Sequence, residues 1–256
     1  MVEANLVEIF SSFQGEGPHV GASTLFVRFG ECDLRCRWCD SPHTWKAGPR
    51  CRIEDRARGE REIANPVALA DVIAAAEALD LARHRFVSLT GGEPLLQPDA
   101  VYATAAALRA LGPRILLETH GLATAALERA IDAIDVVSMG WKLASEVTRA
   151  GAKRGAPREE FHEQHARFLR VARTAGEVYV KVVVTPATRD EELDALARYV
   201  AAVDPQVPVV LQPVTPRGPV KKSPGPAQLL AWQARLEAML RDVRVIPQTH
   251  PGLGVR

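Results

Sequence analysis

The sequence lacks any long run of apolar residues, which limits where the protein can work. A membrane-spanning helix needs roughly 20 consecutive, predominantly apolar residues, and no segment approaches that length. The N-terminal stretch MVEANLVEIFSSFQGEG is interrupted by acidic residues and has none of the features of a signal peptide. We therefore expect a cytoplasmic protein with no membrane contact.

Net charge is also nearly absent, because 32 basic residues face 31 acidic ones. A balance this even gives no electrostatic argument for direct binding to nucleic acid or to an anionic membrane. The sequence contains no internal repeat and no low-complexity tract. With 47% hydrophobic and 25% charged residues in 256 positions, we expect one globular domain spanning residues 1–256.

Cysteine is scarce, with four residues in the chain, but three of the four fall within eight positions. In a reducing compartment, such clustering indicates metal or redox chemistry and not disulfide bonds. The clustered residues are Cys32, Cys36 and Cys39. Cys51 stands apart, and we interpret it as an incidental thiol.

Short apolar runs alternate with helical patterns along most of the chain. The runs, several of them rich in Val and Ile, predict strands at 24–29, 86–89, 115–117, 136–138, 178–184 and 209–211, with a further run at 243–246. The helical patterns cover 66–79 (capped by Asn65), 98–111, 124–134, 157–175, 189–203 and 226–241. This alternation favours parallel βαβ units. About six parallel strands are fewer than a closed barrel needs, so we predict an α/β fold: a partial, TIM-like barrel with outer helices.

The loops after these strands hold most of the chemically unusual segments. In parallel α/β folds, such loops meet at one face of the sheet and form the site. A charge-dense insertion around 47–62, densest at Arg50–Arg61, shows no apolar periodicity. We interpret it as a solvated insertion that could serve as a lid or a docking surface.

The cysteine spacing is C-x3-C-x2-C, which suits a 4Fe–4S cluster. Three thiolates hold three corners of the cube and leave the fourth iron open to a ligand. S-adenosyl-L-methionine can chelate that iron through its amino and carboxylate groups. Two other interpretations of the triad stay open: a structural zinc site completed by His43, and three buried cysteines that bind nothing.

A second motif, Gly91-Gly92-Glu93-Pro94, follows the second predicted parallel strand. Paired glycines let the backbone approach a ligand closely, and the Glu93 carboxylate suits an ammonium group or fixes the loop. In this register with the cysteine triad, the chain resembles the radical S-adenosylmethionine superfamily. The resemblance implies a 4Fe–4S cluster, S-adenosyl-L-methionine, and an electron donor such as flavodoxin or ferredoxin.

Within that superfamily, the stretch 6–46 resembles the 7-carboxy-7-deazaguanine synthases, lyases of queuosine biosynthesis. It includes EIFSSFQGEG and CDLRCRWCDS, and the likeness resumes at 88–96, 117–121, 136–142 and Gln248-Thr249-His250. The resemblance implies radical ring contraction of 6-carboxy-5,6,7,8-tetrahydropterin with loss of ammonia, assisted by Mg²⁺, in a homodimer. It implies no residue acting as a general acid or base.

The same resemblance assigns site residues. It implies substrate contacts by Phe13, Gln14, Gly15, Glu16, Arg28, Thr90 and His250. It implies contacts to S-adenosylmethionine by Trp38, Cys39, Asp40, Gly91, Gly92, Glu93, Glu118, Ser138, Met139 and Gly140. It implies that Ser41 binds Mg²⁺, an ion that uses few protein ligands. Chemically, the Gln14 amide can both donate to and accept from a pterin edge, and the Arg28 guanidinium suits a carboxylate.

The sequence departs from the family pattern at Ser138-Met139-Gly140, where many members have Ser-Pro-Lys. Lys142 lies two residues later than that lysine, so its role stays open. Among other polar residues, Lys181 is expected to face the barrel interior. His162 and His165 lie on a charged helix and are expected to be solvated.

Two competing functions remain. A glycyl-radical activating enzyme would share the cysteine spacing but bind a protein, and the Gln14–Gly17 segment together with Arg28 argues against it. A zinc-stabilised interaction protein would use Cys32, Cys36, Cys39 and His43.

Overall fold

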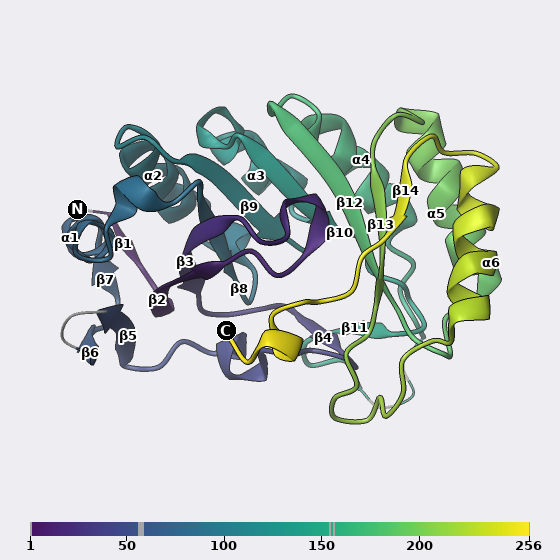
Figure 1. The fold of residues 1–256 in the computed structure, drawn as a ribbon, viewed down its shortest axis with the longest axis horizontal. Helices are drawn as coiled ribbons and strands as arrows, with labels where there is room; N and C mark the ends of the chain where they lie inside the picture. Colours follow the sequence, from purple (N-terminus) through teal and green to yellow (C-terminus); the bar gives the residue numbers. More distant parts are fainter. Residues whose placement is uncertain (1, 56–58, 154, 156, 256) are drawn as a thin grey trace.

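A ten-stranded mixed sheet frames the protein in the computed structural model, which describes residues 2–55, 59–153, 155 and 157–255 (Figure 1). The strand order is β14-β13-β12-β10-β9-β8-β3-β2-β5-β6. The strands are β2 (Leu6–Phe13), β3 (Ser23–Phe29), β5 (Arg50–Asp55), β6 (Gly59–Ala64), β8 (Phe86–Gly91), β9 (Arg114–Thr119), β10 (Val136–Gly140), β12 (Glu177–Val184), β13 (Val209–Pro213) and β14 (Val243–Val245). Two small sheets pair β1 (Glu3–Ala4) with β7 (Val67–Ala68), and β4 (Leu34–Cys36) with β11 (Val147–Arg149).

In the main sheet, the neighbouring strands β3, β8, β9, β10, β12, β13 and β14 are all parallel to one another. They contain the six predicted runs, and the seventh strand, β14, is the further run at 243–246. The partial barrel is therefore confirmed. Within the residues described, β14 and β6 are the two edges and no pairing joins them, so the sheet stays open.

In the described part of the chain, six α-helices lie along the outer side of the sheet (Figure 1). They are α1 (Leu69–Ala78), α2 (Pro98–Arg109), α3 (Thr124–Ala130), α4 (His162–Ala172), α5 (Asp190–Val203) and α6 (Pro226–Glu237). Proline at the first turn of α2 and α6 fits the helix start, where its missing N–H costs no hydrogen bond. Helix α4 is shorter than the predicted 157–175 and begins only at His162.

The predicted start of the first helix at Asn65-Pro66 is wrong. This dipeptide has a cis bond and leads into strand β7 before α1 begins at Leu69. Asn65 does not cap the helix. Its side chain accepts from the Leu6 amide at 3.0 Å and donates to the Gly48 carbonyl at 2.8 Å, which ties the turn to the sheet.

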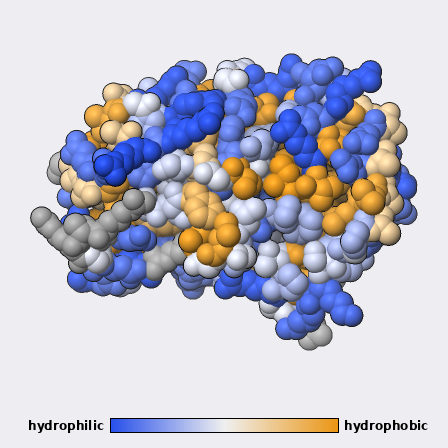
Figure 2. Space-filling view, in the orientation of Figure 1, coloured by the Kyte–Doolittle hydropathy of each residue, from blue (hydrophilic) through white to orange (hydrophobic). Residues whose placement is uncertain are grey.

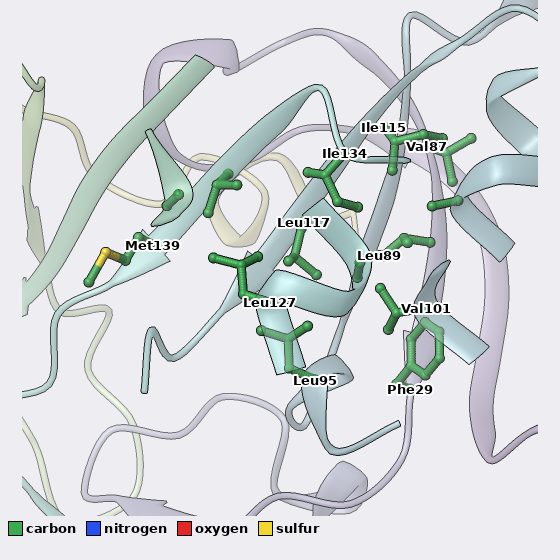
Figure 3. Packing of buried hydrophobic residues seen from close by; sticks show 14 of the residues in the cluster. Phe29, Val87, Leu89, Leu95, Val101, Ile115, Leu117, Leu127, Ile134 and Met139 are labelled. Carbon is green, nitrogen blue, oxygen red and sulfur yellow. The ribbon is translucent and has the colours of Figure 1, made fainter. Parts of the chain in front are cut away.

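The hydrophobic core lies between the parallel strands and the helices. Figure 3 shows residues of β8, β9 and β10 packed against residues of α2 and α3, among them Leu89, Leu117, Val101 and Leu127. All four are fully buried. Full burial of one such side chain is worth about 1.5–3 kcal/mol, so this layer fixes the positions of the strand ends that carry the site.

The charged stretch 50–61 is not a solvated loop. It forms the hairpin β5–β6, and β5 pairs in parallel with β2 and extends the main sheet. Cys51 and Ile53 point into the core with 0% and 1% of their surface exposed, so Cys51 is a core residue. Residues 56–58 lie outside the described residues.

The face seen in Figure 2 is hydrophilic over most of its margin, with hydrophobic residues gathered across its middle and toward the α6 side. Among the residues described, no helix is both long and apolar enough to cross a bilayer.

Candidate active site

A cavity of about 660 Å³ opens where the parallel strands end. Most of the expected site residues line it: Phe13, Gln14, Gly15, Glu16, Arg28, Cys32, Cys36, Trp38, Cys39, Asp40, Ser41, Thr90, Gly91, Gly92, Glu118, Ser138, Gly140 and His250. The two expected residues that do not line it are Glu93 and Met139, which are both fully buried. The topology thus gathers side chains from residue 13 to residue 250 around one space.

The three clustered cysteines lie on the loop after β3, at the cavity wall. Strand β4, which ends at Cys36, pairs with β11 and holds this loop against the body of the protein. All three thiols are half-buried and free. Burial raises the pKa of Cys32 to about 12 and raises that of Cys36, while the Lys142 ammonium nearby opposes both shifts.

The zinc interpretation of this loop does not fit the geometry. In the part of the chain that the structure describes, no three His, Cys, Asp or Glu side chains form a group that could hold a single metal ion. The pKa of His43 is lowered by burial and then by the charges of Arg28 and Arg52, with Glu8 and Asp40 opposing. A zinc ion would need all four ligands within about 2.3 Å of it.

Three soft sulfur ligands on one loop at the wall of a large cavity fit an iron–sulfur cluster with one open corner. Lys142 adds a positive charge beside them, with Nζ 4.9 Å from the centre of the Trp38 ring. The Trp38 Nε1 atom is buried and has no hydrogen-bond partner among the described residues.

Gly91 and Gly92 pack directly on the backbone that carries the cysteines. A Cβ on Gly91 would lie 2.1 Å from the Phe29 carbonyl oxygen, and one on Gly92 would lie 2.0 Å from that of Glu31. Gly91 also has φ of +132°, which side-chain-bearing residues avoid. Any larger residue would separate the two loops.

Glu93 anchors its own loop and does not reach the cavity. Its carboxylate accepts from the Leu95 amide at 3.0 Å, the Thr119 hydroxyl at 2.7 Å and the His120 amide at 2.7 Å. Of the two roles considered for Glu93, the geometry supports fixing the loop. Met139 likewise packs in the hydrophobic core, away from the cavity.

Gln14 and Glu118 meet beside the cavity. The Gln14 amide donates to Glu118 Oε1 at 3.1 Å, and its oxygen accepts from the Glu16 amide at 3.1 Å. The Ser88 hydroxyl also donates to Glu118 Oε1, at 2.6 Å. Gln14 is therefore oriented by the protein, with one amide hydrogen and one oxygen lone pair left for a ligand.

Glu16 collects donors from three distant elements. Lys181 of β12 and Gln248 both contact its carboxylate, and Gln212 of β13 donates to it at 3.1 Å. Burial lowers the pKa of Lys181 to about 8. Lys181 thus faces the interior, as expected. Gln212 is a site residue that the sequence did not single out, and Gln248 lies in the C-terminal segment of the resemblance but had been assigned no site role.

The C-terminal segment crosses the mouth of the cavity. Thr249 N donates to the Gly15 carbonyl at 2.9 Å, and a Cβ on Gly15 would lie 2.4 Å from His250 Nδ1. Gln248 also donates to Asp40 at 2.9 Å, which connects this segment to the cysteine loop. Ser41 Oγ donates to Asp40 Oδ1 at 3.1 Å, so two oxygen groups stand together here.

His162 and His165 are buried, contrary to the expectation from sequence. His165 Nδ1 donates to the Gly121 carbonyl at 2.8 Å, and its Nε2 accepts from the Lys142 amide at 2.8 Å. Trp141 Nε1 donates to His162 Nδ1 at 3.1 Å. The two histidines thus position the segment that carries Lys142.

The chain matches the family model described as Radical SAM superfamily over residues 27–203. It is 36% identical to the 7-carboxy-7-deazaguanine synthase of Geobacter sulfurreducens, over 98% of this chain and 97% of that protein. It is 32% identical to the same-named protein of Methanothermobacter thermautotrophicus, over 100% and 99%. Among solved structures, QueE from Escherichia coli superposes with a TM-score of 0.61 at 22% identity, over 96% of this chain and 93% of that one, which supports the fold.

Proposed function

Because this chain belongs to the 7-carboxy-7-deazaguanine synthase family of the radical S-adenosylmethionine superfamily, we propose that it converts 6-carboxy-5,6,7,8-tetrahydropterin to 7-carboxy-7-deazaguanine with loss of ammonia. The product is a precursor in queuosine biosynthesis. The observation that carries the proposal is one cavity lined both by the cysteine triad and by Gln14, Glu16 and Arg28. Its volume of about 660 Å³ lies within the usual range for small-molecule sites.

The proposed cluster ligands are Cys32, Cys36 and Cys39. A 4Fe–4S cluster held by these thiolates would supply the electron that cleaves S-adenosyl-L-methionine to a 5′-deoxyadenosyl radical, and a donor such as flavodoxin or ferredoxin would provide that electron. The close packing of Gly91 and Gly92 on residues 29–31 keeps the two cofactor-binding loops in contact.

The other proposed cosubstrate contacts are made by side chains and backbone at the strand ends. Trp38 lines the cavity and offers a ring face. Asp40, Glu118, Ser138 and Gly140 line the same space. Lys142, beside the thiols, can pair with a carboxylate.

The pterin is proposed to bind at the other end of the cavity, near β2 and β3. Gln14 and Glu16 are held in place by hydrogen bonds with Lys181, Gln212 and Glu118, so little side-chain freedom is lost when a flat polar ligand binds. Phe13, Gly15, Thr90 and His250 complete the proposed substrate contacts, and Arg28 faces the carboxylate. No side chain is assigned to proton transfer.

Mg²⁺ is proposed to bind at Ser41, with Asp40 beside it. A hydroxyl and a carboxylate 3.1 Å apart supply oxygen ligands, and Mg²⁺ commonly completes its shell with water and substrate.

A homodimer is also expected from the family and is testable by sedimentation.

The glycyl-radical activating enzyme is the less favoured candidate, since the relatives that match almost the full chain are named synthases. The deciding experiment is an anaerobic assay with the reconstituted enzyme, 6-carboxy-tetrahydropterin, S-adenosylmethionine, Mg²⁺ and a reductant. Mass spectrometry should detect 7-carboxy-7-deazaguanine and ammonia. Release of 5′-deoxyadenosine without that product would contradict the proposal.

A further inference from the structure

Three charged side chains form a row across strands β3, β2 and β5 at the edge of the cavity. Glu8 is paired with Arg28 in the register of β2 with β3, and with Arg52 in the register of β2 with β5. Paired positions on neighbouring strands put their side chains on the same face, so the three stand side by side. All three line the cavity.

One carboxylate is shared by the two guanidinium groups. Arg28 Nε donates to Glu8 Oε1 at 2.8 Å, and Arg52 Nη2 contacts Glu8 Oε2. Although burial alone would raise it, Arg52 and Arg28 hold the pKa of Glu8 below its ordinary value. Glu8 is therefore ionised and fixes the spacing between the two arginines.

The row carries one positive charge more than it carries negative charge. The side chains of Glu8 and Arg28 are 5% and 17% exposed, so water screens the Arg28 charge poorly, whereas the Arg52 side chain is 39% exposed. A Glu60 oxygen lies 3.8 Å from Arg52 Nη1, but the Glu60 side chain is 46% exposed, and a surface pair of this kind neutralises little of the Arg52 charge.

The arginines also keep unused donors. Arg28 uses only Nε toward Glu8, and no acceptor among the described residues lies within hydrogen-bonding distance of its Nη atoms. Two partly desolvated guanidinium groups held at a fixed spacing beside a cavity are suited to an anionic oxygen ligand such as a carboxylate.

On the basis of the proposed function, we propose that Arg52 is a specificity-determining residue. It joins Arg28 in recognising the 6-carboxylate of the pterin, with Glu8 holding the pair. The β5–β6 hairpin thereby contributes to the substrate site, although it lies between the two segments, 6–46 and 88–96, on which the family resemblance rests.

The test measures binding to the holoenzyme, loaded with cluster and S-adenosylmethionine under anaerobic conditions without reductant, so that no turnover occurs. The probes are 6-carboxy-tetrahydropterin and the same pterin without the carboxylate, titrated by calorimetry. The variants are Arg52→Ala and Arg52→Lys. Arg50→Ala is the matched control, because Arg50 lies two residues away on the same face of β5 and pairs with exposed Glu62 outside the cavity.

Arg52→Ala should weaken binding of the carboxylated pterin about tenfold or more and leave the carboxylate-free pterin within about twofold of wild type. Arg52→Lys should recover part of the loss, and Arg50→Ala should match wild type. Thermal unfolding checks that the variants are folded, which is expected because the Arg52 side chain is 39% exposed.

Two outcomes would overturn the inference alone while wild type still makes the product. In one, Arg52→Ala binds both pterins as wild type does. In the other, it weakens both equally, which would indicate a merely structural role. If wild type neither binds nor converts the carboxylated pterin, the proposed function fails and this inference fails with it.

Discussion

His120 Nε2 lies 2.9 Å from Asp33 Oδ1, so the end of β9 is tied to the residue that directly follows the first cysteine of the triad. The same histidine donates its backbone amide to Glu93 at 2.7 Å. The hydrogen bond with His120, and secondarily its charge, lowers the pKa of Asp33 to about 2 despite partial burial. One residue therefore connects the cysteine loop to the glycine motif.

Replacing His120 by Ala should loosen the cysteine loop without removing any ligand. The loss of a buried hydrogen-bonded partner should cost about 1–3 kcal/mol. We expect the cluster to form in His120→Ala but to bleach faster than in wild type when a chelator is added, as followed by visible absorbance. His19→Ala is the control, because it removes a histidine–carboxylate contact of similar length, 2.8 Å to Glu177, away from the cavity. Equal bleaching rates in His120→Ala and His19→Ala would show that the contact between His120 and Asp33 does not stabilise the cysteine loop.

Gly92→Ala should disturb cosubstrate binding. The added Cβ would lie 2.0 Å from the Glu31 carbonyl oxygen and 3.1 Å from Cys32 Cβ, so the two loops must separate. We expect the dissociation constant of S-adenosylmethionine to rise about tenfold or more. Gly225→Ala is the matched control, because no atom of the described residues would lie within 4 Å of a Cβ added there. Unchanged affinity in Gly92→Ala would show that this contact does not govern the site.

Single Ala replacements of Cys32, Cys36 and Cys39 should each abolish the cluster absorbance and the cleavage of S-adenosylmethionine. Cys51→Ala should keep both properties but lower the free energy of unfolding by about 1–2 kcal/mol, because the thiol is fully buried in the core. Iron analysis and denaturant unfolding measure the two effects. Loss of the cluster in a folded Cys51→Ala protein would instead make Cys51 a ligand.

Ser41→Ala should weaken the dependence of turnover on Mg²⁺ while the cluster absorbance stays intact. Its hydroxyl is the proposed ligand, and Asp40, 3.1 Å away, would be left to hold the ion. The measurement is a Mg²⁺ titration of the initial rate in both proteins. Identical Mg²⁺ activation curves of the two proteins would show that the ion does not bind at Ser41.

The buried histidines should make folding stability fall at mildly acidic pH. Burial lowers the pKa values of His162 and His165 below the ordinary 6.5, so the unfolded chain takes up protons before the folded chain does. Stability is therefore complete above pH 6.5 and declines as the pH falls below it, by up to about 1.4 kcal/mol per pH unit for each histidine.

Denaturant unfolding of the His165→Gln variant between pH 7.5 and pH 5.5 checks this dependence. Glutamine can keep a donor to Gly121 and an acceptor for Lys142 but does not titrate. The variant should show a shallower loss of stability than wild type. Parallel curves would mean that His165 is not responsible.

The parallel strands were predictable from sequence because burial on both faces leaves continuous apolar runs, such as 178–184 and 209–211. Strand β2 was missed because LVEIFSSF mixes polar and apolar residues in no clear period. The signal for β5 was present: in Arg50-Cys51-Arg52-Ile53, apolar residues alternate with arginines, as expected for a strand with one buried face. The density of charge concealed it.

Within the site, the motif residues that line the cavity could be singled out from sequence because their spacing is local. The cysteines, Gly91 and Gly92 can be recognised from the sequence of their own loops alone. The partners of Glu16 come from positions 181, 212 and 248, and those of His165 from 121 and 142, so only the folded chain brings them together. Arg52 belongs to the same class, because its partner Glu8 is 44 residues away.

Because Cys51 is buried, thiol labelling of the native protein can measure the fraction of molecules that hold a cluster. In the native protein, a thiol-reactive dye should reach only the three half-buried cysteines, and a bound cluster should shield all three. The labelled thiols per chain then report the cluster-free fraction without colour or iron analysis. In denaturant the cluster is lost and Cys51 is exposed, so all four cysteines should react, and this total of four thiols per chain provides the standard against which that fraction is scaled.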